Sequence, residues 1–381
     1  MNVVNVANRA WRASEAENID ADLVALWREI AREAPVSRAI MSNLVVFCRQ
    51  AAADDVDLAL PPEGVPLEEV AASHPARIIL LRHDPDVPGD AGPTVPLAAH
   101  VGVLAFGPPG ARYGVERIVI RSACSEAALP SIVRRLTLGD VPTSVWWTED
   151  LSGTRPLAPL VTMGRQLLYD SRRWRDVRLG VLALAPLLTD AFGPDLADIN
   201  WRRLLPVRQA LVHALGSSGT SKRQRLTSVH IGHRREEAPL AWLLAGWLQS
   251  VWDPPLGGLI PSDGSIPSDG SIRLSASART ARYGETSPKP GEGGKPDPTI
   301  SVDEDSHLGD DVLTASFDDG LHLRLGPHRV SVDDPLGPAP FTVAVPRETE
   351  GEAVAAELCV LTHDRSLHEA LSALVERFGK A

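Results

Sequence analysis

The chain has 381 residues, 44% of them apolar, and a formal net charge of −11. This length exceeds what one typical hydrophobic core serves, so two domains are expected, and the apolar fraction excludes a chain that is disordered throughout. The acidic balance argues against a nucleic-acid-binding protein and against a polybasic membrane-surface protein. No apolar run reaches the roughly 18 residues of a membrane span, and the N-terminus lacks a secretory pattern, so a cytoplasmic protein is expected.

The first half of the chain alternates between helical and strand patterns. Leu23, Leu26 and Ile30 recur at helical spacing behind Asp20 or Asp22, either of which is expected to cap the helix. The predicted helices are residues 20–33, 66–73 and 125–138. The predicted strands are residues 40–48, 77–81, 98–107, 114–123, 141–147 and 165–171. This alternation predicts an α/β domain over residues 1–178, with a mixed sheet and helices packed on it.

The second half, residues 179–381, is predicted to be an α+β domain. Helices are predicted at 195–215, on both sides of Pro206, and at 238–252, 352–361 and 367–378. The last of these is expected to open with a capping box made by Ser366 and Glu369. The predicted strands are residues 226–233, 299–305, 312–319 and 321–326.

An insert interrupts this second domain at about residues 254–298. It is rich in Pro, Ser and Gly, and the hexapeptide PSDGSI occurs twice, at 261–266 and 267–272. Segments of this composition bury too little apolar surface to fold alone, so an irregular insert without a function of its own is expected.

The sequence contains none of the common catalytic or nucleotide-binding motifs. There is no GxGxxG after a strand, no Walker A, no GxSxG and no HExxH. The basic loop from Lys222 to Arg225 leads into a strand and not into a helix, which favours a solvated loop over a phosphate site. His230 and His233 lie three residues apart on a predicted strand, so they point to opposite faces and do not share a metal ion. We therefore expect no catalytic residue, cofactor or metal.

The three cysteines are Cys48, Cys124 and Cys359, and their spacing matches no metal site and no CxxC pattern. They are interpreted as structural thiols in a reducing compartment, because a redox switch needs an exposed thiolate of low pKa.

Two tryptophans stand side by side in DVPTSVWWTED, residues 140–150. Neighbouring side chains on a strand point to opposite faces, so Trp146 and Trp147 are expected on the two sides of the sheet, at least one of them in the core. Glu149 and Asp150 follow after Thr148, and an ordinary acidic strand exit is favoured over a general acid and base. Trp147, nearer to this exit, is the candidate to support a partner-facing loop.

This segment resembles the Pro-to-Trp-Trp strand of the glucose-6-phosphate dehydrogenase assembly proteins, the OpcA family. SHPARIILL at 73–81 and QLLYDS at 166–171 resemble two further strands of the family. DLADINWRRLLPVR resembles a family helix through Trp201, Arg203 and Arg208, and LLAGWLQSVW resembles another that contains Trp247. The similar segments follow the family's order from about Met41 to Leu371, interrupted by the insert.

The resemblance implies a protein without catalysis of its own. Family members bind the cytosolic glucose-6-phosphate dehydrogenase, promote its assembly and raise its activity at the entry to the oxidative pentose phosphate pathway. A non-catalytic assembly factor and allosteric activator of this dehydrogenase is therefore expected. The candidates for partner binding are Trp146, Trp147, Glu149, Asp150, Trp201, Arg203, Arg208 and Trp247.

Two alternatives remain open. One is an enzyme or sensor that binds a sugar phosphate through Arg203, Arg208 and the loop from Lys222 to Arg225. The other is a scaffold that binds the dehydrogenase without changing its kinetics.

Overall fold

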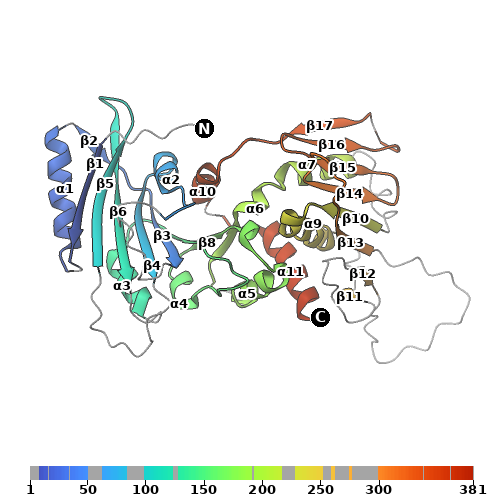
Figure 1. Cartoon of the computed structure of the whole chain (residues 1–381), viewed down its shortest axis with the longest axis horizontal. Coiled ribbons are helices and arrows are strands. Elements are labelled where there is room, and N and C mark those ends of the chain that lie inside the picture. Colours follow the sequence, from blue (N-terminus) through green and yellow to red (C-terminus); the bar gives the residue numbers. More distant parts are fainter. Residues whose placement is uncertain are drawn as a thin grey trace, which may run out of the picture. The chain divides into compact units, whose positions relative to one another are not determined.

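The computed structural model describes most of the chain. The described residues are 8–15, 17–33, 35–49, 62–83, 98–122, 128–190, 193–216, 228–251, 259–261, 274–276, 299–337, 339–360 and 362–380. They form two compact units, each built from three chain segments (Figure 1). The first unit comprises Met1–Arg173, Thr189–Ile199 and Glu348–Asp364, and the second comprises Trp174–Leu188, Asn200–Arg347 and Arg365–Ala381. The domain boundary after residue 178 remains a prediction.

The first unit is built on a large mixed sheet. Its strands within the described residues are β1 (Asn8–Ser14), β2 (Val36–Arg38), β3 (Ser42–Arg49), β4 (Ala76–His83), β5 (Ala98–Phe106), β6 (Arg112–Ser122), β7 (Thr143–Trp147), β8 (Gln166–Tyr169) and β9 (Asp195–Asp198). They lie in the order β1-β5-β6-β4-β3-β7-β8-β9, with the short β2 paired to β6. Strands β1 and β5 run antiparallel to their neighbours, so the mixed sheet expected from the sequence is confirmed.

Six strands of this sheet form a continuous parallel block. From one side to the other they are β6, β4, β3, β7, β8 and β9. Numbered by their order along the chain, these strands lie in the order 3-2-1-4-5-6. The direction in which new strands are added therefore reverses between β3 and β7, and this place is called the switch point below.

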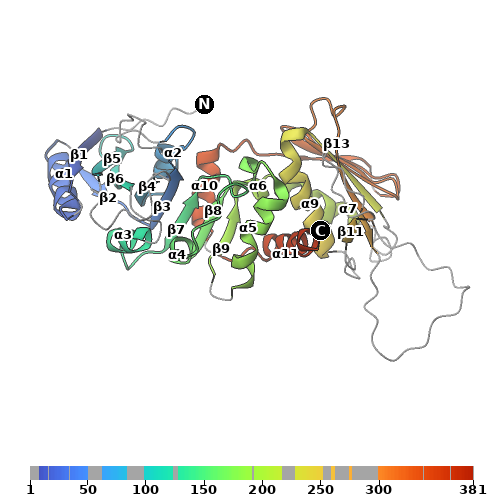
Figure 2. The same ribbon diagram turned by 60° about the horizontal axis from the view of Figure 1, so that its bottom comes forward.

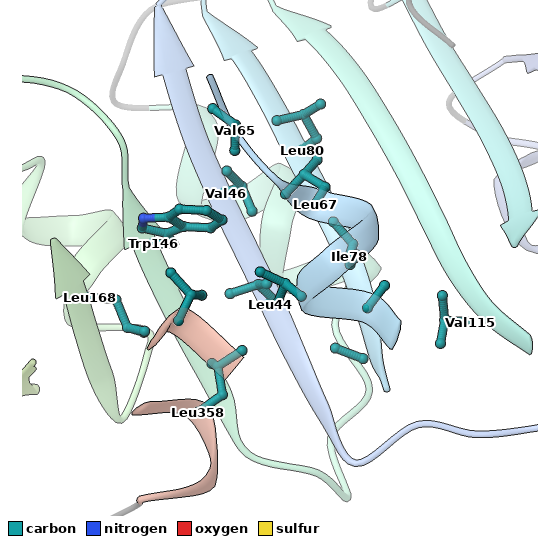
Figure 3. Close-up of a cluster of buried hydrophobic side chains, with 14 of the residues drawn as sticks. Leu44, Val46, Val65, Leu67, Ile78, Leu80, Val115, Trp146, Leu168 and Leu358 are labelled. Atoms are coloured by element: carbon teal, nitrogen blue, oxygen red, sulfur yellow. The ribbon is translucent and has the colours of Figure 1, made fainter. Parts of the chain in front are cut away.

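The helices of the first unit are α1 (Ile19–Glu33), α2 (Leu67–Ser73), α3 (Leu129–Leu136), α4 (Ala158–Val161) and α10 (Glu350–Cys359), with a 3-10 turn, η2, at Ser171–Arg173. Helices α2 and α10 are far apart in the sequence but pack side by side, and both contribute to one apolar cluster (Figure 3). In this cluster Leu44 and Val46 of β3 meet Trp146, Leu67 and Leu358. Both faces of β3 are buried, which explains why it reads as a nearly continuous apolar run.

The second unit is α+β, as expected. Its helices are α5 (Val177–Thr189), α6 (Ile199–Arg202), α7 (Leu205–Gly216), α9 (Ala238–Val251) and α11 (Arg365–Gly379), with a 3-10 turn, η3, at Arg235–Glu237. Its main sheet has the order β13-β10-β14-β15-β16-β17. These strands are β10 (Ser228–His233), β13 (Thr299–Glu304), β14 (Leu313–Phe317), β15 (His322–Leu325), β16 (Arg329–Asp333) and β17 (Phe341–Ala344).

Helices α7 and α9 pack on one face of this sheet, and α11 lies alongside α9 (Figure 2). Gly246 in α9 makes the close approach possible, because a Cβ atom there would lie 2.6 Å from the carbonyl oxygen of Ala370 in α11. Of the predicted insert, only β11 (Leu259–Pro261) and β12 (Leu274–Ala276) lie within the described residues, where they pair antiparallel.

Three local expectations were wrong. Residues Asp195–Asp198 form strand β9 and not the start of a helix, because they pair in parallel with β8. Helix α1 begins at Ile19, so Asp20 and Asp22 lie in its first turn and do not cap it. Helix α11 begins at Arg365, and Glu369 accepts a hydrogen bond from Arg365 Nε at 2.7 Å, so Ser366 opens no capping box.

A capping box does exist at the other C-terminal helix. Thr349 and Glu352 exchange hydrogen bonds at the start of α10, the hydroxyl accepting from one backbone N–H and the carboxylate from the other. Strands β1, β2, β16 and β17 and helices α4 and α5 were not expected from the sequence.

Candidate functional site

The two adjacent tryptophans lie on opposite faces of β7, and both are in the core. Trp146 is 1% exposed and belongs to the cluster under α2 and α10 (Figure 3). Trp147 is 0% exposed and stacks on Phe47 of β3, with ring centroids 4.1 Å apart and planes 7° apart. A role of Trp147 in supporting a partner-facing loop remains a prediction, and the buried indole itself offers no contact surface.

A row of three rings crosses the sheet at the carboxyl ends of its parallel strands. Phe47 lies between Trp147 and His83 of β4, whose ring centroid is 6.0 Å away. All three side chains are buried. The row occupies the switch point, and ligand sites of parallel sheets lie just outside such a point. This edge is therefore the candidate site that the fold itself indicates.

The acidic pair after β7 is engaged in local hydrogen bonds. Glu149 Oε1 accepts from the backbone N–H of Arg49 at the end of β3, at 2.8 Å. Asp150 Oδ1 accepts from the backbone N–H and the hydroxyl of Ser152, at 2.8 and 2.7 Å. These contacts join two strand ends and shape a turn, which agrees with the expected acidic strand exit.

The next strand ends along this edge also carry buried carboxylates. Asp170 binds the guanidinium of Arg172, with Oδ2 2.6 Å from the Nη2 atom. Asp198 accepts from the backbone N–H of Ser171 at 3.1 Å. Burial, with Asp198 and Asp364 nearby, raises the pKa of the Tyr169 hydroxyl well above its ordinary value. The Asp170–Arg172 pair and the hydrogen bond from Ser171 to Asp198 tie η2 to the ends of β8 and β9.

Arg173 connects the same edge to α10. Its Nη2 atom lies 2.8 Å from Glu350 Oε1 at the start of that helix, and its Nη1 atom donates to the carbonyl oxygen of Thr148 at 3.4 Å. The first unit is thus braced across segments that are far apart in the chain.

The two candidate arginines of the second unit, Arg203 and Arg208, are each engaged by another side chain. Both terminal nitrogens of Arg203 lie 2.7 Å from the carboxylate of Glu237, and Nη1 also donates to Asn200 Oδ1 at 2.9 Å. The guanidinium of Arg208 stacks over the buried Trp201 ring at 4.0 Å. Trp247 is buried in α9. The loop from Lys222 to Arg225 lies outside the described residues.

A hydrogen-bonded chain of three side chains in the first unit was not foreseen. The Nε2 atom of His74 lies 2.9 Å from the Ser42 hydroxyl, and its Nδ1 atom lies 3.4 Å from the Cys359 sulfur. Burial lowers the pKa of His74. Ser42 and His74 are 32 positions apart in the sequence, and His74 and Cys359 are 285 positions apart. Because of these separations, no sequence motif predicts the contact.

The thiols that the structure describes differ strongly. Cys48 is buried, and this burial raises the pKa of its thiol to about 12, with Arg82 opposing the shift and Glu149 adding to it. Cys359 is exposed, so the burial argument for a structural thiol holds for Cys48 and not for Cys359. Cys124 lies outside the described residues.

The described residues contain neither a cluster of three candidate metal ligands nor a helix that could span a membrane. No group of three His, Cys, Asp or Glu side chains there is placed to hold a metal ion. His230 contacts Ser301 and Asp303 on the exposed side of β10, whereas His233 is buried and contacts the carbonyl oxygen of Arg234. None of the helices in the described ranges has the length and apolar character to cross a bilayer.

Two family models match the sequence in consecutive segments. The model that describes the N-terminal domain of the glucose-6-phosphate dehydrogenase subunit matches residues 67–185. The model that describes the C-terminal domain of the same protein matches residues 194–371. Among curated proteins, no sequence matches the chain.

Several solved structures are distantly similar to the chain. A putative oxidoreductase from Magnetospirillum magnetotacticum is 12% identical with a TM-score of 0.43, over 90% of this chain and 100% of that one. An oxidoreductase from Thermotoga maritima is 11% identical with a TM-score of 0.42, over 90% and 94%. A putative oxidoreductase from Klebsiella pneumoniae is 13% identical with a TM-score of 0.39, over 88% and 92%. Likenesses this distant carry no argument about the chain.

Proposed function

Because the chain belongs to the OpcA family of glucose-6-phosphate dehydrogenase assembly proteins, we propose that it is a non-catalytic assembly factor and allosteric activator of that dehydrogenase. The observation that carries the proposal is the match of both family domains, in order, to residues 67–185 and 194–371. The chain would act in the cytoplasm, at the entry to the oxidative pentose phosphate pathway.

The chemistry of the candidate residues supports a role without catalysis. Glu149 and Asp150 hold backbone N–H groups, and Arg203 is engaged on both terminal nitrogens by Glu237. A general acid or base needs a reacting group within hydrogen-bond reach, and a phosphate site needs guanidinium donors that are not committed to a carboxylate. These side chains make hydrogen bonds within the chain itself. This favours an effect on the dehydrogenase that is exerted through binding and not through catalysis.

Activation through binding sets a thermodynamic condition. The chain must bind the more active state of the dehydrogenase more tightly than the less active state, since a ligand with equal affinity for both shifts nothing. A coupling of about 1–3 kcal/mol, which is typical of allosteric pairs, would change the apparent substrate affinity by roughly 5- to 150-fold.

The experiment is a titration of this chain into the glucose-6-phosphate dehydrogenase of the same organism. Sedimentation velocity reports the complex, and initial rates report KM and kcat for glucose 6-phosphate at each ratio. The proposal expects a saturable complex and a change in KM or kcat that saturates at the same ratio. No complex would overturn it, and a complex with unchanged kinetics would leave only the scaffold alternative.

The sugar-phosphate alternative is tested on the isolated chain. Calorimetry with glucose 6-phosphate and with 6-phosphogluconate detects a direct site, and Arg203→Gln is the variant that such a site would not tolerate. Saturable heat that this substitution abolishes would favour a sensor over a pure assembly factor. The Glu237 pairing leads us to expect no such heat.

A further inference from the structure

The strand order of the first unit is the one found in dinucleotide-binding sheets. Parallel sheets in the order 3-2-1-4-5-6 hold dinucleotides in a crevice beyond the carboxyl ends of the first and fourth strands. In this chain those strands are β3 and β7, which pair directly through Phe47 and Trp147. The residues of this edge therefore decide whether such a cofactor fits.

The segment after β3 lacks what a pyrophosphate requires. Dinucleotide sites use glycines so that backbone N–H groups approach the phosphates, and they place the phosphates at the N-terminus of the next helix. The sequence between β3 and α2, residues 50–66, contains a single glycine, Gly64, and not the spaced glycines of such a site, and its four carboxylates are Asp54, Asp55, Asp57 and Glu63. The next described helix, α2, has Glu68 and Glu69 in its first turn. Six carboxylates thus follow β3 in the sequence, whereas a dinucleotide site has backbone N–H groups there that donate hydrogen bonds to the phosphates.

An internal carboxylate already binds the strand end. Glu149, just after the fourth parallel strand, accepts the backbone N–H of Arg49, the last residue of the first parallel strand. Thr148 donates both its backbone N–H and its hydroxyl to the carbonyl oxygen of Phe47, at 3.2 and 2.8 Å. Pairing between the two strands therefore continues past Trp147, across the place where a crevice would open.

Buried aromatic rings lie at the same strand ends as this hydrogen bond. His83, Phe47 and Trp147 form the row across the three strand ends, and each is at most 3% exposed. Arg82, at the end of the second parallel strand, stands near the position of the arginine that receives a ribose 2′-phosphate in NADP sites. Its side chain is 1% exposed and so does not face solvent.

We infer that this sheet, although of the dinucleotide-binding order, is closed to a dinucleotide by its own residues. The Glu149 carboxylate accepts the strand-end N–H group that a phosphate would otherwise accept. The buried rings of His83, Phe47 and Trp147 occupy the strand ends where a crevice would lie. The edge is a brace between β3 and β7. Any dependence of a complex with the dehydrogenase on NADP(H) then arises from the dehydrogenase chain.

The first test is equilibrium binding of NADPH and NADP+ to the full chain, by nucleotide fluorescence and calorimetry. A nucleotide-binding dehydrogenase under the same conditions is the positive control. Hydrogen exchange at the Arg49 amide and the Trp147 indole N–H is followed with and without nucleotide. We expect no saturable binding at the edge and no change in exchange at either group. Saturable binding accompanied by slower exchange at both groups would overturn the inference.

The second test uses substitutions of Glu149, whose carboxylate accepts the hydrogen bond from the Arg49 amide. Glu149→Ala removes the acceptor and is expected to speed exchange at the Arg49 amide by roughly three- to tenfold. Glu149→Gln keeps an acceptor oxygen and is the matched control, expected to exchange as the wild-type chain does. Unchanged exchange in Glu149→Ala would contradict the assigned role of the carboxylate.

These results are independent of the proposed function. A chain that activates the dehydrogenase and also binds NADPH at this edge would overturn only the closed-edge inference. A chain that binds no nucleotide and forms no complex with the dehydrogenase would overturn only the proposed activation.

Discussion

The ring of Trp147 lies flat against the ring of Phe47, with centroids 4.1 Å apart, although the two residues are separated by about a hundred positions in the chain. The stack joins the first and fourth strands of a parallel block at the point where the strand order reverses. A place that in other sheets receives a ligand is here part of the core.

Trp147→Ala is expected to lower the free energy of unfolding of the first unit by about 3–5 kcal/mol, because it removes a fully buried ring and leaves a cavity. Trp147→Phe is expected to cost much less. It keeps an aromatic ring against Phe47 and removes an indole N–H that is buried without a hydrogen-bond acceptor in the described structure. Urea unfolding followed by circular dichroism measures both, with Val24→Ala on the exposed side of α1 as the control. Equal losses for the Phe and Ala variants would contradict the stacking account.

His74 should make the stability of the first unit depend on pH. Burial lowers its pKa below the ordinary value of 6.5, so the unfolded chain binds a proton more readily than the folded chain does. The contribution of the neutral imidazole is therefore fully present above about pH 6.5 and is lost as the pH falls below that value. Urea unfolding of His74→Gln at several pH values is expected to show a flatter dependence than the wild-type chain, whereas His307→Gln, at an exposed position, should follow the wild type. An unchanged slope in His74→Gln would contradict the assignment.

The cysteines should react with an alkylating reagent at very different rates. The thiolate is the reactive form, and Cys48 is both inaccessible and raised in pKa to about 12. Iodoacetamide at about pH 8 is expected to modify Cys359 in the folded chain and to reach Cys48 only after unfolding. Peptide mapping by mass spectrometry distinguishes the three cysteine sites. Labelling of Cys48 at the rate of Cys359 in the folded chain would show that the β3 edge opens.

Arg203 and Glu237 should be energetically coupled. The pair is bidentate but partly exposed, with 30% of the arginine side chain accessible, so solvent screening limits the coupling to about 1 kcal/mol. A double-mutant cycle of Arg203→Gln and Glu237→Gln, measured by urea unfolding at low and high salt, gives this value. Additive effects of the two substitutions would show that Arg203 is available for another partner.

Much of the fold could be predicted from local patterns. Short apolar runs predict strands β3 and β7, and a broad apolar face predicts helix α9. The structure has all three elements at the predicted places. Strand β9 was missed because DLAD has only four residues and precedes a helical pattern, so its state depends on pairing with β8. Ser366 and Glu369 have the three-residue spacing of a capping box, and so do Thr349 and Glu352. The capping box forms only at Thr349 and Glu352, so spacing alone does not distinguish the two sites.

The candidate site was less predictable. Sequence reasoning placed Trp146 and Trp147 on opposite faces, since adjacent side chains on a strand alternate. It did not foresee that Phe47 stacks on Trp147 or that the Arg49 amide binds Glu149, because pairing across the sheet depends on strand order and not on local sequence. The link from Cys359 through His74 to Ser42 was missed for the same reason.

The central claim is tested most directly by the rate of glucose-6-phosphate dehydrogenase at a substrate concentration below its KM, measured as this chain is added. The account predicts that the rate rises and saturates at the stoichiometry of the complex seen in sedimentation. A rate that stays constant while the complex forms, or the absence of any complex, would contradict it.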